Sequence, residues 1–165
     1  MDRRHFVFGI GAAAAFSSVA RDGHAECGEL TAVEFVRELY EKQARLHAAK
    51  APLSQEEFHA LFSSDLRQLM QAPRRIQSNA PIGPLLNAFF GWGVLPGTEV
   101  TIGKITLVSG NYEGPATVGI DLNYRGESHR ILVHAVREKE VWLVANIIHD
   151  SGKSLVAHYR GITGR

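Results

Sequence analysis

The apolar residues in the first third of the chain recur at steps of three and four, which is the period of an amphipathic helix. Val36 and Leu39 lie on one face of such a helix, and charged residues fall largely on the other. Thr31 is followed three residues later by Glu34, which is the capping-box pattern that begins a helix. The sequence therefore predicts a helix over Thr31–Lys50.

A second stretch with the helical period begins at Ser54, after a break at Ala51–Pro52. Its apolar stripe runs to Met70, and Pro73 closes it because proline cannot continue a helix. Ser63–Asp65, in the middle of this stretch, can serve as a second cap. The pattern leaves open whether one helix or two form here.

The period changes to two after Thr98, where apolar and polar residues alternate as they do along half-buried strands. Four runs with this alternation are predicted as strands: Glu99–Ser109, Ala116–Tyr124, Ser128–Val136 and Val141–Asp150. Short, turn-like breaks separate them, and short turns between consecutive strands predict an antiparallel meander. A last amphipathic turn or helix is predicted around Leu155 and Tyr159.

Helices followed by an antiparallel meander predict an α+β fold, in which N-terminal helices pack on a curved four-stranded sheet and a short C-terminal helix follows. The segment from Arg74 to Gly97 lies between the two parts and is rich in proline and glycine. It also carries Phe89, Phe90 and Trp92. Because an exposed patch of three aromatic rings would be costly, we expect them to pack onto the core or to line a cleft.

The first residues have the composition of an export signal and not of a folded element. Arg3–Arg4 stands ahead of an apolar run from Val7 to Phe16. Two stretches shaped like signal-peptidase sites follow, ending at Ala20 and at Ala25. The arginine pair resembles a twin-arginine signal. We therefore expect a cleaved signal peptide over residues 1–25 and a periplasmic location in a bacterium.

An uncleaved membrane anchor is disfavoured, because the apolar run falls short of the roughly 20 residues that span a bilayer. General secretion remains an alternative to the twin-arginine route, since Asp2 stands where that motif usually has Ser or Thr. Cleavage after Ala20 or after Ala25 is also open. In either case residues 26–165 are predicted to form a single α+β domain, with no stable membrane insertion once the signal is removed.

The chain carries 18 basic and 17 acidic residues, and cleavage at either site leaves equal numbers of the two. A domain without net charge lacks the excess of positive charge that attracts nucleic acid or an anionic membrane surface, which argues against both partners. Cys27 is the only cysteine, so no internal disulfide can form. His129 and His134 are five residues apart on one predicted strand and face opposite sides, so they cannot share a metal. We predict no metal and no cofactor.

The order of these elements and three short segments carry a resemblance to a known family. The segments are Phe35–Tyr40, Val141–Ile147 and Gly152–Leu155. The chain resembles a family of exported bacterial domains of unknown function that is similar to the nuclear-transport-factor-two-like, or cystatin-like, superfamily. The resemblance implies a cone of helices wrapped by a bent sheet, with one pocket between them. The family usually carries acidic residues after Trp142, where this chain has Ala145–Asn146, and this departure argues against acid-based chemistry there.

Two classes of function follow from such a pocket. The leading hypothesis is non-catalytic binding of a small apolar molecule or of a protein partner. Its candidate ligand-binding residues are Phe89, Phe90, Trp92, Trp142 and Asn146. Trp142 can instead anchor the core, and Asn146 can instead satisfy a neighbouring backbone group.

The second class is a small enzyme, an isomerase or a hydrolase, in which Asp121 would act as a base and His134 would donate or relay a proton. The resemblance implies this role, because catalytic relatives such as ketosteroid isomerases use a buried carboxylate. Asp121 can instead form a cross-strand ion pair with Arg130. A third hypothesis is an immunity or envelope-maintenance partner that blocks another protein. Pairing of two copies into a homodimer is also open for a sheet of this kind.

Overall fold

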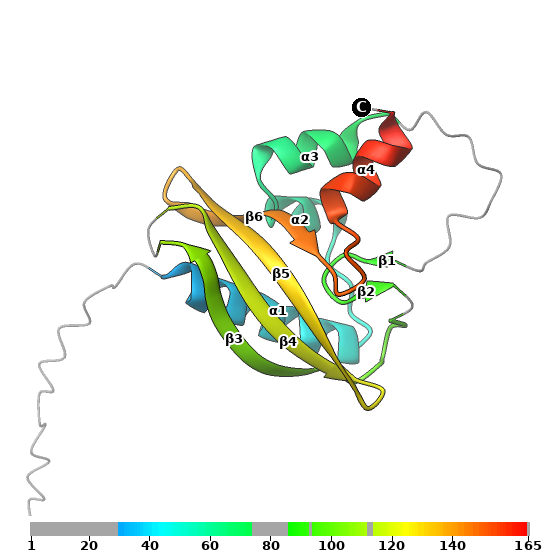
Figure 1. Ribbon diagram of the computed structural model, residues 1–165. Helices are drawn as coiled ribbons and strands as arrows, with labels where there is room; N and C mark the ends of the chain where they lie inside the picture. The colour runs from blue at the N-terminus through cyan, green and yellow to red at the C-terminus, as the bar shows by residue number, and fades with distance from the viewer. Residues whose placement is uncertain (1–29, 74–85, 93, 112–113, 165) are drawn as a thin grey trace, which may run out of the picture.

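The computed structural model describes residues 30–73, 86–92, 94–111 and 114–164 (Figure 1). The signal peptide expected over residues 1–25 lies outside these ranges. Within them, helices precede an antiparallel sheet and a short helix follows it. The α+β class predicted from the sequence is therefore confirmed.

Helix α1 (Ala32–Ala48) begins where its capping pattern predicts. The Thr31 hydroxyl accepts a hydrogen bond from the Glu34 N–H at 3.3 Å, and the Glu34 carboxylate accepts one from the Thr31 N–H at 2.8 Å. This reciprocal pair satisfies two N–H groups that have no partner inside the helix. Val36 and Tyr40, on the apolar face, are fully buried, so the helix is held both by its cap and by its packing.

The second apolar stretch forms two helices, α2 (Gln55–Ala60) and α3 (Ser64–Gln71). Ser54 and Glu57 form a second capping box at the start of α2. The Ser63 hydroxyl caps the start of α3. The internal cap therefore divides the stretch, which settles the alternative that the sequence left open.

Four antiparallel strands form one open sheet in the order β3-β4-β5-β6. The strands are β3 (Thr101–Gly110), β4 (Ala116–Tyr124), β5 (Glu127–Glu138) and β6 (Val141–Ile148). Each strand pairs with its neighbour along the chain, so the predicted meander is confirmed. Helix α4 (Leu155–Thr163) follows the sheet and is capped by Ser154.

A small hairpin that the sequence did not predict lies between α3 and β3. β1 (Leu86–Asn87) pairs antiparallel with β2 (Gly91–Trp92) across a turn that contains Phe89 and Phe90. Strands of two residues are too short to show an alternation, and the glycines and prolines around them are typical of a loop. The hairpin brings the two phenylalanines back towards α1.

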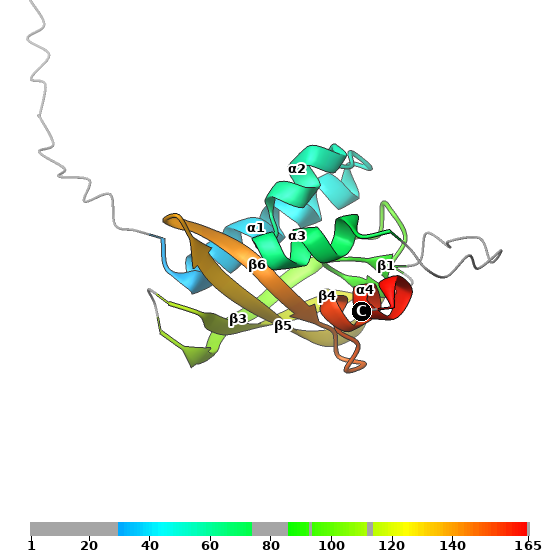
Figure 2. The same ribbon diagram turned by 90° about the horizontal axis from the view of Figure 1, so that it is seen from above.

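α1 lies across one face of the sheet (Figures 1 and 2). The side chains that β4 and β5 turn to this inner face are buried: Val118, Ile120, Leu122, Ile131, Val133 and Ala135. Each large aliphatic side chain buried in this way contributes about 1.5–3 kcal/mol. α4 packs against α3 and β6 at one end of the sheet. Buried core side chains therefore occupy the space between α1 and these strands.

Candidate functional site

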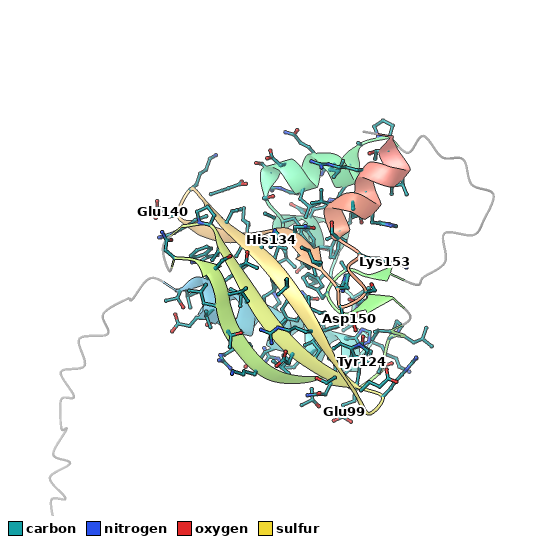
Figure 3. All side chains as sticks on the ribbon, in the orientation of Figure 1. Glu99, Tyr124, His134, Glu140, Asp150 and Lys153 are labelled. Atoms are coloured by element: carbon teal, nitrogen blue, oxygen red, sulfur yellow. The ribbon has the colours of Figure 1, made fainter. Side chains whose placement is uncertain are left out.

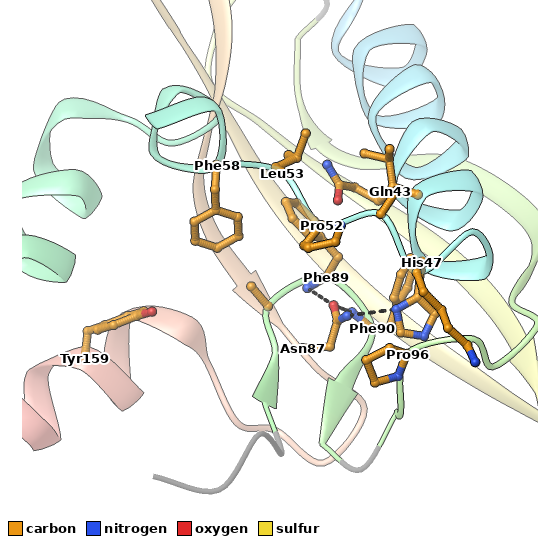
Figure 4. Close-up of a pocket in the computed structure, with 14 residues that line it drawn as sticks. Gln43, His47, Pro52, Leu53, Phe58, Asn87, Phe89, Phe90, Pro96 and Tyr159 are labelled. Atoms are coloured by element: carbon orange, nitrogen blue, oxygen red, sulfur yellow. Dashed lines mark hydrogen bonds between the residues drawn. The ribbon is translucent and has the colours of Figure 1, made fainter. Parts of the chain in front are cut away.

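A pocket of about 460 Å³ lies beside the C-terminal end of α1 (Figure 4). It is bounded by the last turns of α1, the loop into α2, the β1–β2 hairpin and Tyr159 of α4. Its apolar lining includes Leu46, Pro52, Leu53, Phe58, Phe89 and Phe90. A mostly apolar pocket of this size is typical of a small-molecule site. We call it the α1 pocket.

A cluster of aromatic rings forms one wall of the α1 pocket. The Phe89 ring lies 5.9 Å from the rings of Tyr40 and Phe62, measured between centroids, and 6.1 Å from that of Phe58. The Phe90 ring lies 6.2 Å from that of Tyr40. Such pairs each contribute about 0.5–1.5 kcal/mol beyond the burial of area. Because Phe89 and Phe90 are 3% and 1% exposed, this wall is part of the core.

Asn87 shapes the hairpin turn and joins it to α1. Its Oδ1 accepts hydrogen bonds from the N–H groups of Phe89, at 3.0 Å, and Phe90, at 3.1 Å. Its Nδ2 lies 3.3 Å from Nδ1 of His47 (Figure 4). One amide side chain therefore holds both the turn and the last part of α1 in place around the pocket.

Two polar side chains of α1 line the pocket without satisfying all of their hydrogen-bonding groups. Gln43 and His47 stand one turn apart on the same face of the helix, and they are only 8% and 9% exposed. The Nε2 atom of each has no hydrogen-bond partner in the described part of the chain. An unsatisfied buried polar group costs about 1–3 kcal/mol. Such groups call for an explanation, and a bound ligand that supplies the partner is one.

Phe90 also lines a second, smaller cavity of about 200 Å³. Here Nδ1 of His129 lies 2.5 Å from Oδ2 of Asp150, and the Tyr124 ring stacks on the imidazole at 4.0 Å. The Tyr124 hydroxyl donates to the Phe90 carbonyl at 3.3 Å. Figure 3 shows Tyr124 and Asp150 at the same end of the sheet. The carboxylate and the tyrosine ring thus fix the orientation of the His129 imidazole.

This second cavity has the parts of a proton-transfer site. A histidine whose Nδ1 is held by a carboxylate can use Nε2 as a general base. Nε2 of His129 has no hydrogen-bond partner among the described residues and lies 3.7 Å from the Glu127 carboxylate. The hydrogen bond from His129 holds the pKa of Asp150 below its usual 3.8, so this carboxylate stays ionised. Ser151 and Lys153 also line the cavity.

His149 lines the same cavity and is 5% exposed, and neither ring nitrogen has a hydrogen-bond partner in the described ranges. Burial lowers the pKa of its imidazole from the ordinary 6.5, and the nearby charge of Asp150 opposes this only in part. The His149 imidazole therefore binds a proton more readily in the unfolded chain than in the folded chain. The stability contributed by neutral His149 is present above pH 6.5 and is lost as the pH falls through the folded-state pKa.

We expect the free energy of unfolding to fall as the pH is lowered from about 7 to about 5, and we expect this fall to be less steep in His149→Gln. Urea unfolding at several pH values measures both slopes. Ser151→Ala changes the same cavity without removing a titratable group, so it should keep the slope of the unchanged protein. Equal slopes in His149→Gln and in the unchanged protein would contradict the account of a buried, neutral His149.

The structure distributes the predicted ligand-binding residues over different regions. Phe89 and Phe90 line the α1 pocket. The side chain of Trp92 lies outside what the structure describes. Trp142 is 7% exposed, and its Nε1 donates to the Leu30 carbonyl at 2.6 Å, so it packs at the start of α1 and lines neither cavity.

Asn146 also lies apart from the lining of the two cavities. Its Oδ1 accepts a hydrogen bond from the Val156 N–H at 3.0 Å, which joins β6 to the first turn of α4. This is the backbone-satisfying role that the sequence allowed as an alternative.

The two predicted catalytic residues are not brought together in either cavity. Oδ1 of Asp121 accepts a hydrogen bond from Nη1 of Arg130 at 2.6 Å, directly across the β4–β5 ladder, which is the ion pair that the sequence allowed as the alternative to catalysis. His134 pairs with Thr117 on one side and Asn146 on the other. Figure 3 shows His134 well along the sheet from Asp150. Neither Asp121 nor His134 lines the α1 pocket or the smaller cavity.

The polar residues of the two cavities were not among the predicted site residues. A signal for Gln43 and His47 exists in the sequence, since they stand four residues apart on the apolar face of the predicted helix. Asn87 carries no comparable signal. Nor does any local pattern link His129 to Asp150, which is 21 positions further along the chain.

Within the described residues, no group of three or more His, Cys, Asp or Glu side chains is placed to hold a metal ion. In the same ranges no helix is long and apolar enough to cross a bilayer. Comparison with family models, with curated proteins and with solved structures gives no match to this chain. Function is therefore argued from the geometry and chemistry of the site.

Proposed function

We propose that the protein is an exported binding protein that holds a small, mostly apolar molecule in the α1 pocket without transforming it. The observation that carries the proposal is the pair of buried side chains, Gln43 and His47, which line this pocket with an unpartnered Nε2 each. A ligand that supplies the missing hydrogen bonds recovers the stability that these groups cost, and it stabilises the folded chain by mass action.

The size and the lining of the pocket support a small molecule over a protein partner and over catalysis. Its volume of about 460 Å³ falls in the range of small-molecule sites. A stable protein partner would instead need a broad contact surface, which a pocket of this size does not provide. Among the described residues that line it there is no Asp or Glu to act as a base on a carbonyl compound. Tyr159 and Asn87 add further polar groups without adding a charge.

The proposal also includes three expectations from the sequence: a signal peptide, a periplasmic location and a cone-shaped arrangement of the helices and the sheet. The signal peptide over residues 1–25 and the periplasmic location are proposed from the twin arginines and the apolar run that follows them. The cone-shaped, nuclear-transport-factor-two-like arrangement is proposed because α1 packs across one face of a four-stranded antiparallel sheet.

Binding of the neutral fluorescent probe N-phenyl-1-naphthylamine to the purified protein tests the proposal. We expect saturable binding of one probe per chain. Ala51→Trp places a large ring in the α1 pocket and is expected to weaken binding about tenfold or more. Ala157→Trp is the control, because Ala157 is an exposed alanine of α4 outside the lining, and it should leave the Kd within about twofold.

Two outcomes would count against the proposal. One is the absence of saturable probe binding. The other is equal binding by Ala51→Trp and Ala157→Trp, since the probe would then sit at another place.

A further inference from the structure

The orientation of the Asn87 amide is fixed by the backbone around it. One of its terminal atoms accepts hydrogen bonds from two N–H groups, those of Phe89 at 3.0 Å and Phe90 at 3.1 Å. The carbonyl oxygen can accept both, whereas the amide nitrogen carries two hydrogens and donates. Oδ1 therefore faces the turn, and Nδ2 is the atom that faces His47.

This orientation decides which nitrogen of the neutral His47 ring carries the proton. Nδ2 of Asn87 is a donor and lies 3.3 Å from Nδ1 of His47, so Nδ1 must be the acceptor. A neutral imidazole with an unprotonated Nδ1 holds its proton on Nε2. His47 therefore offers an N–H donor from Nε2, and this buried donor has no partner in the described part of the chain.

Two further side chains of the α1 pocket, Gln43 and Lys50, also carry hydrogen-bond donors. Nε2 of Gln43, one helical turn before His47, is a second buried donor without a described partner. Lys50, three residues after His47, also lines the pocket and brings an ammonium group. No Asp or Glu stands among the described lining residues. An apolar pocket with free donors and a positive charge is complementary to a ligand with acceptor oxygens and a negative charge.

We infer that the ligand of the α1 pocket is an apolar monocarboxylate, whose carboxylate oxygens accept hydrogen bonds from Nε2–H of His47 and from the Gln43 amide. The inference rests on the proposed function and adds the chemical class of the ligand. The apolar body lies against the wall formed by Phe58 and Phe89, and the ammonium group of Lys50 balances the charge at the polar end.

Three linear probes of eight carbon atoms each separate the contribution of the polar group from that of the apolar contact. Octanoate, octylamine and 1-octanol are titrated calorimetrically into the purified protein. We expect the Kd of octanoate to be lower than that of octylamine by about tenfold or more, because an ammonium group has no acceptor for the two donors. 1-Octanol, with one neutral oxygen, should bind with an intermediate Kd.

The outcomes distinguish this inference from the proposed function. If octylamine or 1-octanol binds as tightly as octanoate, and N-phenyl-1-naphthylamine still binds in the α1 pocket, the carboxylate assignment is wrong and the binding function stands. If neither the alkyl probes nor the naphthylamine binds, the carboxylate assignment and the proposed binding function are both wrong.

His47→Phe keeps an aromatic ring at the pocket wall and removes the donor. We expect the affinity for octanoate to fall about tenfold, as for the loss of one hydrogen bond to a charged group, and the affinity for the uncharged naphthylamine to fall by a smaller factor. His59→Phe, on α2 outside this pocket, is the matched variant and should change neither Kd. Equal losses for both probes in His47→Phe would mean that His47 only supports the wall, and would overturn the inference.

A measurement on the unchanged protein keeps the inference testable even if His47→Phe does not fold. Nitrogen NMR of the histidine rings distinguishes a protonated ring nitrogen from an unprotonated one. We expect His47 to be protonated on Nε2 alone, and we expect the Nε2–H signal to shift when octanoate is added. A proton on Nδ1, or an Nε2 signal that saturating octanoate leaves in place, would overturn the assignment.

Discussion

Replacement of Phe90 by alanine is expected to lower the free energy of unfolding by about 3–5 kcal/mol. The ring is 1% exposed and contacts Tyr40 and His47 at centroid distances of 6.2 Å and 5.1 Å. It also lines both the α1 pocket and the smaller cavity. Its removal would therefore leave a space continuous with two existing hollows, which the neighbouring side chains cannot fill by small shifts. The loss combines the transfer of the ring to water with the cost of that remaining space.

Urea unfolding followed by circular dichroism measures this loss. Leu95→Ala is the control, because Leu95 is an apolar residue of the same chain segment that is 50% exposed, and its truncation should stay within about 0.5 kcal/mol. Phe90→Leu, which keeps part of the volume, should fall between the two. A loss below about 1.5 kcal/mol in Phe90→Ala would show that the surroundings collapse onto the space, and that no packed ring separates the two cavities.

The parts of the fold with local signals could be predicted from the sequence. Thr31 and Glu34 mark the start of α1 because both members of the capping box lie within one turn. The alternation around Ile120 assigns the inner face of β4 because a strand has a period of two. The ion pair between Asp121 and Arg130 follows in turn, since a meander with a short turn places these residues opposite one another.

The candidate site could not be located in the same way, because its polar groups come from distant parts of the chain. His47 and Asn87 are 40 positions apart and meet only because the hairpin folds back against the end of α1. The sequence indicated that Phe89 and Phe90 would reach the core or a cleft, but it did not indicate which helix they would meet. Contacts of this kind depend on the whole tertiary arrangement, for which no local period gives a signal.

Asn146 lies on a different face of β6 from the one that a simple alternation predicts, because one extra residue interrupts the pairing. A period of two would place Asn146 on the same face of β6 as Trp142. The pairing of β6 with β5 shifts by one residue, however: His134 pairs with Asn146, whereas the next residue of β5 pairs with Val144 and skips Ala145. As in a β-bulge, the extra residue reverses the alternation. Asn146 is therefore out of phase with Trp142, and the two side chains do not converge on one site.

Replacement of Gly110 by alanine is expected to cost about 2–5 kcal/mol, because two penalties act at one residue. Gly110 has φ +95°, which L residues rarely adopt. A Cβ at this position would also overlap the carbonyl oxygen of Pro115 and lie 2.6 Å from Cα of Ala116, its partner on β4. Both are backbone atoms, so the overlap can be relieved only by moving the end of β4 away from β3.

Gly126→Ala separates the two penalties. Gly126, in the turn between β4 and β5, has φ +80°, but a Cβ there would have nothing within 4 Å. This variant should therefore show the conformational penalty alone, about 1–2 kcal/mol, in the same urea unfolding measurement. The difference between the two variants then reports the cost of separating β3 from β4. Equal losses would mean that the strands part at this point without cost, and that the pairing of Gly110 with Ala116 does not help to hold the edge of the sheet.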